Sequence, residues 1–148
     1  VPAYVPVPST AVDTDLRPIV MLTKQLQGVQ ESLVGATTQA GNGAAIFSVS
    51  NGVFGDRMNI ANVVTRVEPS AGQGPFYTAA SGLPDPDLSM TSINGGGLFS
   101  DLPPGEYHMA FSGIPDDCYI LFGWARAERV RFTIAADHVT VVRIECPE

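Results

Sequence analysis

The chain has 148 residues, enough for one domain with a core of its own, and 45% of them are hydrophobic. Charged residues make up only 16%, and the formal net charge is −7 because Lys24 is the only lysine. Phosphate groups are bound by clustered Lys and Arg, whereas the arginines here are spread along the chain, so nucleic acid and an anionic membrane surface are not expected as partners. The sequence also lacks the run of about 18 apolar residues that a membrane-spanning helix needs.

A proline-rich segment begins the chain, with prolines at positions 2, 6 and 8. Proline has no backbone donor for a β-ladder, so Val1–Thr10 is expected to be an extended arm and not a central strand. We assign residues 1–15 to this arm and residues 16–148 to a single domain. The arm is either a disordered leader or a segment that docks on a neighbour, and its candidate docking side chains are Tyr4, Val5 and Val7.

The first expected strand is Arg17–Gln27, in which Val20, Leu22, Lys24 and Leu26 lie on one face. Leu16–Leu33 also has helical propensity. The β-branched residues after Pro18 and the absence of capping residues favour a strand. Gln30–Thr38 is expected to be another short strand or an extended connection.

Further strands are expected wherever β-branched or aromatic residues alternate with polar ones between turn residues. Asn51-Gly52 is a strong signal for a hairpin turn after the expected strand Gly43–Ser50, because both Asn51 and Gly52 accept a positive φ. Gly123 would interrupt one of the later strands as a bulge. The expected strands are Gly43–Ser50, Ile60–Glu68, Pro75–Ala79, Cys118–Trp124, Val130–Ile134 and His138–Cys146.

The most informative stretch runs from Gly95 to Phe111. Leu98-Phe99 begins a strand after three glycines, and Pro103-Pro104-Gly105 forms a tight turn. Tyr107, Met109 and Phe111 then follow at a spacing of two and share one face of a strand. This pattern predicts a β-hairpin corner. With about eight to ten short strands in all, the chain is expected to be an all-β, two-sheet Greek-key sandwich.

Residues 96–107, Gly-Gly-Leu-Phe-Ser-Asp-Leu-Pro-Pro-Gly-Glu-Tyr, resemble the carboxypeptidase regulatory-like domains. That family is similar to the prealbumin and pilin B-type folds, and the match is best over Ile93–Ile144. The resemblance implies a transthyretin- or immunoglobulin-like sandwich. It also implies an accessory, adhesive or assembly role without catalysis, since most family members have such roles. The N-terminal motif of the family is absent from this chain.

Cys118 and Cys146 are the only cysteines. They form no C-x-x-C motif and have no histidine cluster near them in the sequence, which argues against a metal or redox pair. We therefore predict a disulfide, with Cα atoms about 4.4–6.8 Å apart. A disulfide indicates an oxidising compartment, so the protein is expected to be secreted or at the cell surface, with the periplasm as an alternative.

No catalytic or cofactor motif is present, so an enzyme, a cofactor and a structural metal are not expected. His108 and His138 are interpreted as surface residues. The acidic residues of two loops have the hard oxygen atoms that Ca²⁺ prefers, but acidic loop residues are more often turn formers. These residues are Asp85, Asp87, Asp116 and Asp117.

Lys24 raises one further hypothesis, which rests on the resemblance. Pilin B-type relatives can join a strand lysine to an Asn or Asp side chain with the help of a buried carboxylate, for which Glu106 or Glu145 would be the helper here. Neither glutamate lies in the expected motif. A lysine at a sheet edge is the simpler interpretation.

Two functions are compatible with these observations. The first is a noncatalytic, secreted structural or interaction module that self-assembles, or binds another extracellular protein, through its N-terminal arm. The second is a carbohydrate- or peptide-binding accessory module of a larger secreted enzyme, with Trp124 as the candidate platform for a glycan.

Overall fold

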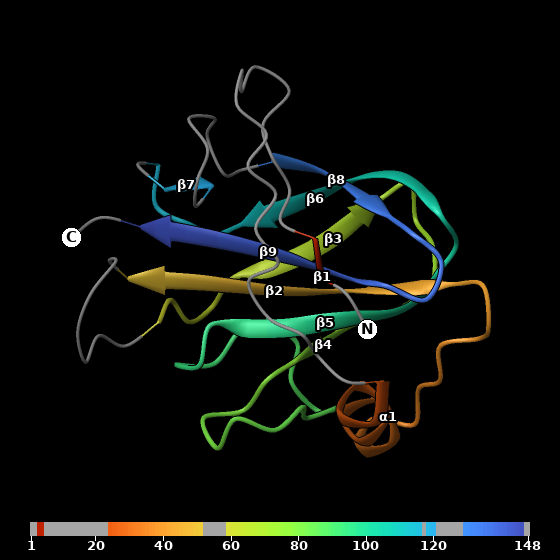
Figure 1. Cartoon of the computed structure of the whole chain (residues 1–148). Helices are drawn as coiled ribbons and strands as arrows, with labels where there is room; N and C mark the ends of the chain where they lie inside the picture. Colours follow the sequence, from red (N-terminus) through yellow and green to blue (C-terminus); the bar gives the residue numbers. More distant parts are fainter. Residues whose placement is uncertain (1–2, 5–23, 52–58, 117, 121–128, 147–148) are drawn as a thin grey trace.

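The computed structural model describes residues 3–4, 24–51, 59–116, 118–120 and 129–146. These residues form two packed β-sheets and one helix (Figure 1), which confirms the all-β sandwich. The large sheet has the strand order β1 (Ala3–Tyr4), β9 (Val139–Cys146), β2 (Gly43–Asn51), β5 (Gly96–Leu102) and β4 (Gln73–Tyr77). A short strand, β7 (Tyr119–Ile120), also pairs with β9. The small sheet has the order β3 (Val64–Glu68), β6 (Gly105–Ser112) and β8 (Arg129–Ile134).

The core lies between the two sheets and is built mainly from alternating residues of β2, β6, β8 and β9. Phe47 of β2 is at its centre, fully buried, with ring centroids 5.8 Å from Phe99 and 6.0 Å from both Tyr77 and Phe111. Gly97 is the register partner of Phe47, and a Cβ at this position would overlap the Phe47 ring. One glycine of the 95–97 run is therefore needed to make room for the central aromatic ring.

The turn at residues 103–105 is not a hairpin, which corrects the prediction. β5 pairs with β2 and β4, while β6 pairs with β3 and β8, so the chain crosses from the large sheet to the small one at this point. The Tyr107 hydroxyl donates a hydrogen bond to the Pro103 carbonyl over 2.7 Å and closes the crossing. The predicted shared face of Tyr107, Met109 and Phe111 is confirmed, since all three are buried in the core.

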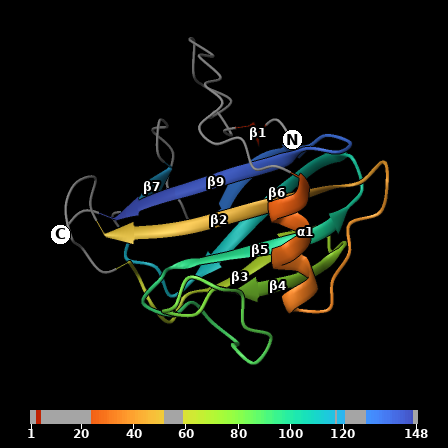
Figure 2. The same cartoon turned by 60° about the horizontal axis from the view of Figure 1, so that its bottom comes forward.

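The segment expected as a strand and an extended connection contains helix α1 (Lys24–Leu33) instead. Its sequence, KQLQGVQESL, is rich in Lys, Gln, Leu and Glu, which favour helices. The proline and β-branched residues that favoured a strand precede it and lie outside the described residues. Gly35, with φ of 69°, ends the helix in the left-handed conformation. Figure 2 shows α1 crossing the large sheet on the side away from the small sheet.

Several predicted strand boundaries also shift. The strand expected to begin at residue 60 begins at Val64, because Asn62 has a φ of 64° and Thr91 bonds the backbone of Asn62 and Val63. The strand expected at residues 75–79 is β4, which begins earlier. β2 pairs with β5 and β9, and the segment expected to form a hairpin with it, residues 52–58, lies outside the described residues.

Candidate functional site

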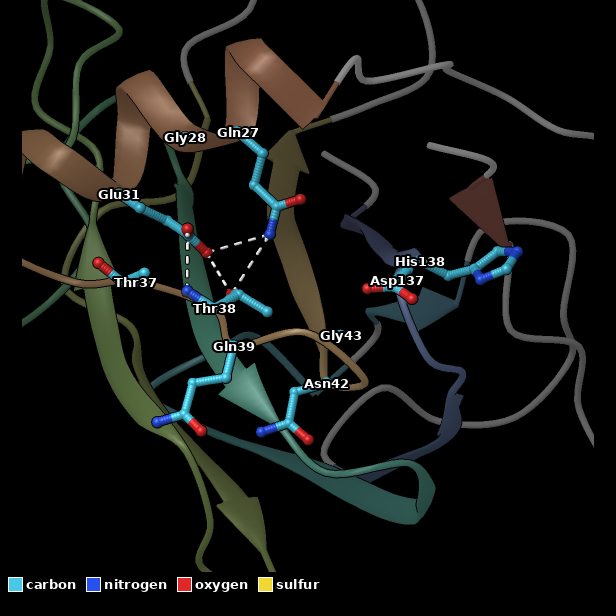
Figure 3. Close-up of a pocket in the computed structure, with 10 residues that line it drawn as sticks. All are labelled: Gln27, Gly28, Glu31, Thr37, Thr38, Gln39, Asn42, Gly43, Asp137 and His138. Carbon is cyan, nitrogen blue, oxygen red and sulfur yellow. Dashed lines mark hydrogen bonds between the residues drawn. The ribbon is translucent and has the colours of Figure 1, made fainter.

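A polar pocket of about 200 Å³ lies where α1, the 37–43 loop and the β8–β9 turn meet (Figure 3). Gln27, Gly28 and Glu31 line it from the helix, residues 37–43 line it from the loop, and Asp137 and His138 line it from the turn. Its lining side chains carry amide, hydroxyl, carboxylate or imidazole groups: Gln27, Glu31, Thr37, Thr38, Gln39, Asn42, Asp137 and His138.

Glu31 lines the pocket from the helix and is buried although it is acidic. Its Oε1 accepts hydrogen bonds from Gln27 Nε2 over 3.0 Å and from the Thr38 hydroxyl, and its Oε2 accepts one from the Thr38 backbone N–H over 3.2 Å. The Thr38 hydroxyl in turn accepts the backbone N–H of Asp101 over 3.0 Å. This Glu31–Thr38–Asp101 network ties the helix to the loop and to β5.

Asp101 continues the network beneath the pocket. Its Oδ1 accepts the backbone N–H of Gln39 over 3.0 Å and the side-chain amide of Asn42 over 2.8 Å. The hydrogen bond from the Gln39 backbone, followed by those from Asn42 and Gln73, lowers the pKa of Asp101 below its usual value. Asp101 is thus an ionised anchor for the 39–42 loop.

The turn between β8 and β9 is held in place by hydrogen bonds to backbone carbonyl groups. The Asp137 N–H donates to the Asn42 carbonyl over 2.9 Å, and the His138 Nδ1–H donates to the Ala136 carbonyl over 2.6 Å. A Cβ on Gly43 would come within 2.8 Å of the His138 carbonyl oxygen, so β2 and the turn approach each other closely.

The chemistry of the pocket is that of a polar junction. Glu31, Thr38 and Asp101 bond to one another, so little of their hydrogen-bonding capacity is left for a ligand. Within the described residues, no three His, Cys, Asp or Glu side chains converge to hold a metal ion. The groups that remain for a ligand are the side chains of Thr37 and Gln39 and Oδ2 of Asp137, since the Oδ1 of Asp137 accepts the Gly41 N–H over 3.4 Å.

The two cysteines are joined by a disulfide, as expected. The sulfur atoms of Cys118 and Cys146 are bonded, the Cα atoms are 4.1 Å apart, and both side chains are buried. The Cα separation is slightly shorter than the predicted range. The bond links the residue before β7 to the last residue of β9, so it closes the end of the large sheet.

The predicted arm and the predicted platform lie mostly outside the described residues. Tyr4 belongs to β1, which runs parallel to β9 with Ala3 opposite Val139 and Tyr4 opposite Thr140. Val5 and Val7, like Trp124, lie outside the described residues. Their proposed roles stay predictions.

The other candidate residues lie apart in the structure. Lys24 is the first residue of α1, so its predicted place on a strand face is wrong. Glu106 lies 3.3 Å from Arg131 in an exposed ion pair, while Glu145 is buried on β9. Asp85 accepts the backbone N–H of Asp87 over 2.9 Å, the bond of a turn-forming aspartate. Asp117 lies outside the described residues, and Asp116 is exposed.

One cluster is not apparent from the sequence: three arginines gather on the outer face of the small sheet. Arg66 of β3 and Arg129 of β8 each lie 3.0 Å from Glu68, and Arg131 of β8 pairs with Glu106 of β6. The hydrogen bonds from Arg129 and then Arg66 lower the pKa of Glu68. We call this surface the arginine face. His108 lies on it between Glu68 and Arg131, because these three residues are cross-strand partners.

No family model matches the chain, and no curated protein matches it. Among solved structures, the chain is similar to GBS52, the minor pilin of the gram-positive pathogen Streptococcus agalactiae, with 18% sequence identity and a TM-score of 0.46. The match covers 74% of this chain and 45% of the pilin chain, so this chain spans less than half the length of that pilin. None of the described helices is both long and apolar enough to cross a membrane.

Proposed function

We propose that this protein is a noncatalytic structural module of the cell surface or extracellular space, and that it self-assembles through its N-terminal arm. The placement of β1 beside β9 is the observation that carries the proposal, because it puts the start of the arm on a sheet edge. The disulfide supports an oxidising location.

The edge of β9 has room for more chain than β1 provides. On the side away from β2, β1 pairs with Val139 and Thr140, and β7 pairs with Ile144 and Glu145. None of the described strands pairs with residues 141–143 on this side. Unpaired backbone donors and acceptors on a sheet edge are a template for an added strand. The arm of a second copy would fill this gap by β-augmentation.

The test is deletion of residues 1–10. We expect the full chain to form oligomers in sedimentation and negative-stain electron microscopy, and the deletion variant to remain monomeric. A variant that keeps ten residues of alternating Gly and Ser in place of the arm is the matched control, since it has the length but not the sequence of the arm. Oligomers that persist unchanged after the deletion would overturn the proposal, provided that both variants melt within about 4 °C of the full chain.

A carbohydrate-binding accessory role is the second candidate, and the polar pocket is the observation that favours it. Sugars are bound through hydroxyl, amide and carboxylate groups such as those of Thr37, Gln39 and Asp137. In this case a glycan array should give saturable binding that falls in a Gln39→Ala or a Trp124→Ala variant. An array without hits would argue against this role.

A further inference from the structure

We propose that the 79–95 loop of one copy docks on the arginine face of the next copy, in a head-to-tail contact. This inference rests on the proposed self-assembly: it adds a second contact on surfaces other than the arm, and both contacts are required to hold the copies together. It follows from three observations: the order within the loop, the side chains that the loop exposes, and the separation of charge over the described surface.

The 79–95 loop is long but has a defined shape. It is closed at its base, where the Ser92 hydroxyl donates to the Thr78 carbonyl over 2.6 Å, and within it the Ala79 N–H donates to the Leu83 carbonyl over 2.8 Å. Thr91 is buried and bonds both Ile60 and Val63. Compact loops of this length without strands or helices of their own are uncommon, and they are often functional.

This ordered loop exposes large apolar side chains. Leu83 is 55% exposed, Ile93 52% and Met90 38%, and these are three of the six large apolar residues that are exposed in the described part of the chain. Asp85 and Asp87 lie between them in the sequence. A surface that is already ordered loses little conformational entropy on binding, so a loop of this kind is suited to docking.

Charge is divided between the loop and the arginine face. The arginine face carries Arg66, Arg129 and Arg131, each 57–63% exposed, against only two carboxylates. The other described residues include seven acidic side chains, of which Asp85 and Asp87 lie in the loop and Glu31 and Glu145 are buried. The loop itself carries no basic residue. The guanidinium groups can pair with acidic residues, while the arginine stems cover apolar ones.

This distribution favours a second copy of the chain as the partner, in a head-to-tail arrangement. A symmetric contact between two arginine faces, or between two acidic loops, would place like charges together. A loop on an arginine face pairs opposite charges instead. Because the two surfaces differ, the contact is heterologous and can repeat along a filament or close into a ring.

The test uses two variants and their mixture. Arg129→Glu combined with Arg131→Glu changes the face, and Asp87→Arg changes the loop. Sedimentation should show self-association weakened at least about tenfold in each variant alone. An equimolar mixture should recover association, because the unchanged face of one variant meets the unchanged loop of the other. Leu83→Ser should weaken association without a change in charge.

Asp116→Arg is the matched control, since it makes the same charge change at an exposed residue outside the loop. It should leave association unchanged. The head-to-tail contact would be overturned if the arginine-face variant and the Asp87→Arg variant both associate normally. It would also be overturned if their mixture does not recover association. If these variants assemble normally while deletion of the arm abolishes assembly, the arm proposal stands and this one fails. If deletion of the arm leaves assembly unchanged while these variants lose it, the head-to-tail contact stands and the arm proposal fails. A wild-type chain that is always monomeric contradicts both proposals.

Discussion

Glu145 is a charged side chain that the fold buries, with only 2% of its surface exposed. Its neighbours Ile144 and Cys146 belong to the core, so Glu145 points to the opposite face of β9. One carboxylate oxygen lies 3.6 Å from Arg143 Nη2, and the other has no hydrogen-bond partner among the described residues. Burial raises the pKa of Glu145 above its usual 4.5, and the positive charge of Arg143 offsets only part of this effect.

The raised pKa predicts the direction of a pH effect. The folded state binds the Glu145 proton more tightly than the unfolded state, so its contribution to stability is complete below pH 4.5 and is lost as the pH rises through the folded pKa. At pH 7 the carboxyl group ionises freely in the unfolded chain, whereas burial opposes its ionisation in the folded state. Glu145→Gln should raise the melting temperature at pH 7, by about 2–4 °C for each kcal/mol recovered, and should change it little at pH 4.

Thermal melts at both pH values test this prediction. Glu106→Gln is the control, because it makes the same chemical change in an exposed ion pair and should alter stability by no more than about 0.5 kcal/mol. A Glu145→Gln variant that melts lower than wild type at pH 7 would contradict the conclusion that burial raises the pKa of Glu145.

At the scale of elements, α1 is held by polar contacts. None of the side chains described for the helix, those of residues 27–33, belongs to the main core cluster, and Val29 and Leu33 are exposed. The helix instead directs Gln27 and Glu31 toward the 37–43 loop, where the Glu31–Thr38–Asp101 network fastens it. An element attached in this way opens more readily than the strands of the core.

Thr38→Val should therefore loosen α1 without unfolding the sandwich. The substitution keeps the shape of the side chain but removes the hydroxyl that joins Glu31 to Asp101, at a cost of about 1–3 kcal/mol. Hydrogen exchange should become faster in residues 24–33 and stay unchanged in β2 and β9. Thr37→Val, at the exposed neighbouring position, is the control. Unchanged protection of α1 in the Thr38 variant would show that other contacts hold the helix.

At the scale of the whole molecule, the disulfide closes the end of the large sheet where β7 and β9 meet. Its cysteines are 28 positions apart in the sequence, so the bond should stabilise the fold by about 3.5 kcal/mol through its effect on the unfolded chain. Cys118→Ala combined with Cys146→Ala should therefore lower the melting temperature by about 7–14 °C. Melts of the wild-type chain with and without a reducing agent should show the same difference. A fall in melting temperature of less than about 2–4 °C, which corresponds to about 1 kcal/mol, would mean that the bond contributes little.

Features that depend on local periodicity and on residue counts could be predicted from the amino-acid sequence. The alternation of Tyr107, Met109 and Phe111 predicts a strand with one buried face, since side chains in a strand point to opposite sides in turn. The strand positions near Val130–Ile134 and His138–Cys146 follow in the same way, and two cysteines without a second plausible use predict the disulfide. The two-sheet sandwich follows from these short strands and the turns between them.

Which helices and strands lie together became clear from the three-dimensional structure. Residues 24–33 are rich in helix-forming residues, but the proline and β-branched residues just before them favour a strand, so the local sequence pattern supports both structures. The placement of β5 and β6 in different sheets depends on their pairing with β2, β3 and β8, which no local pattern records. The arginine face arises because β6 pairs with β3 on one side and β8 on the other, which brings Arg66 together with Arg129 and Arg131. Such contacts join residues far apart in the chain, so they follow from strand pairing and packing and not from any single segment.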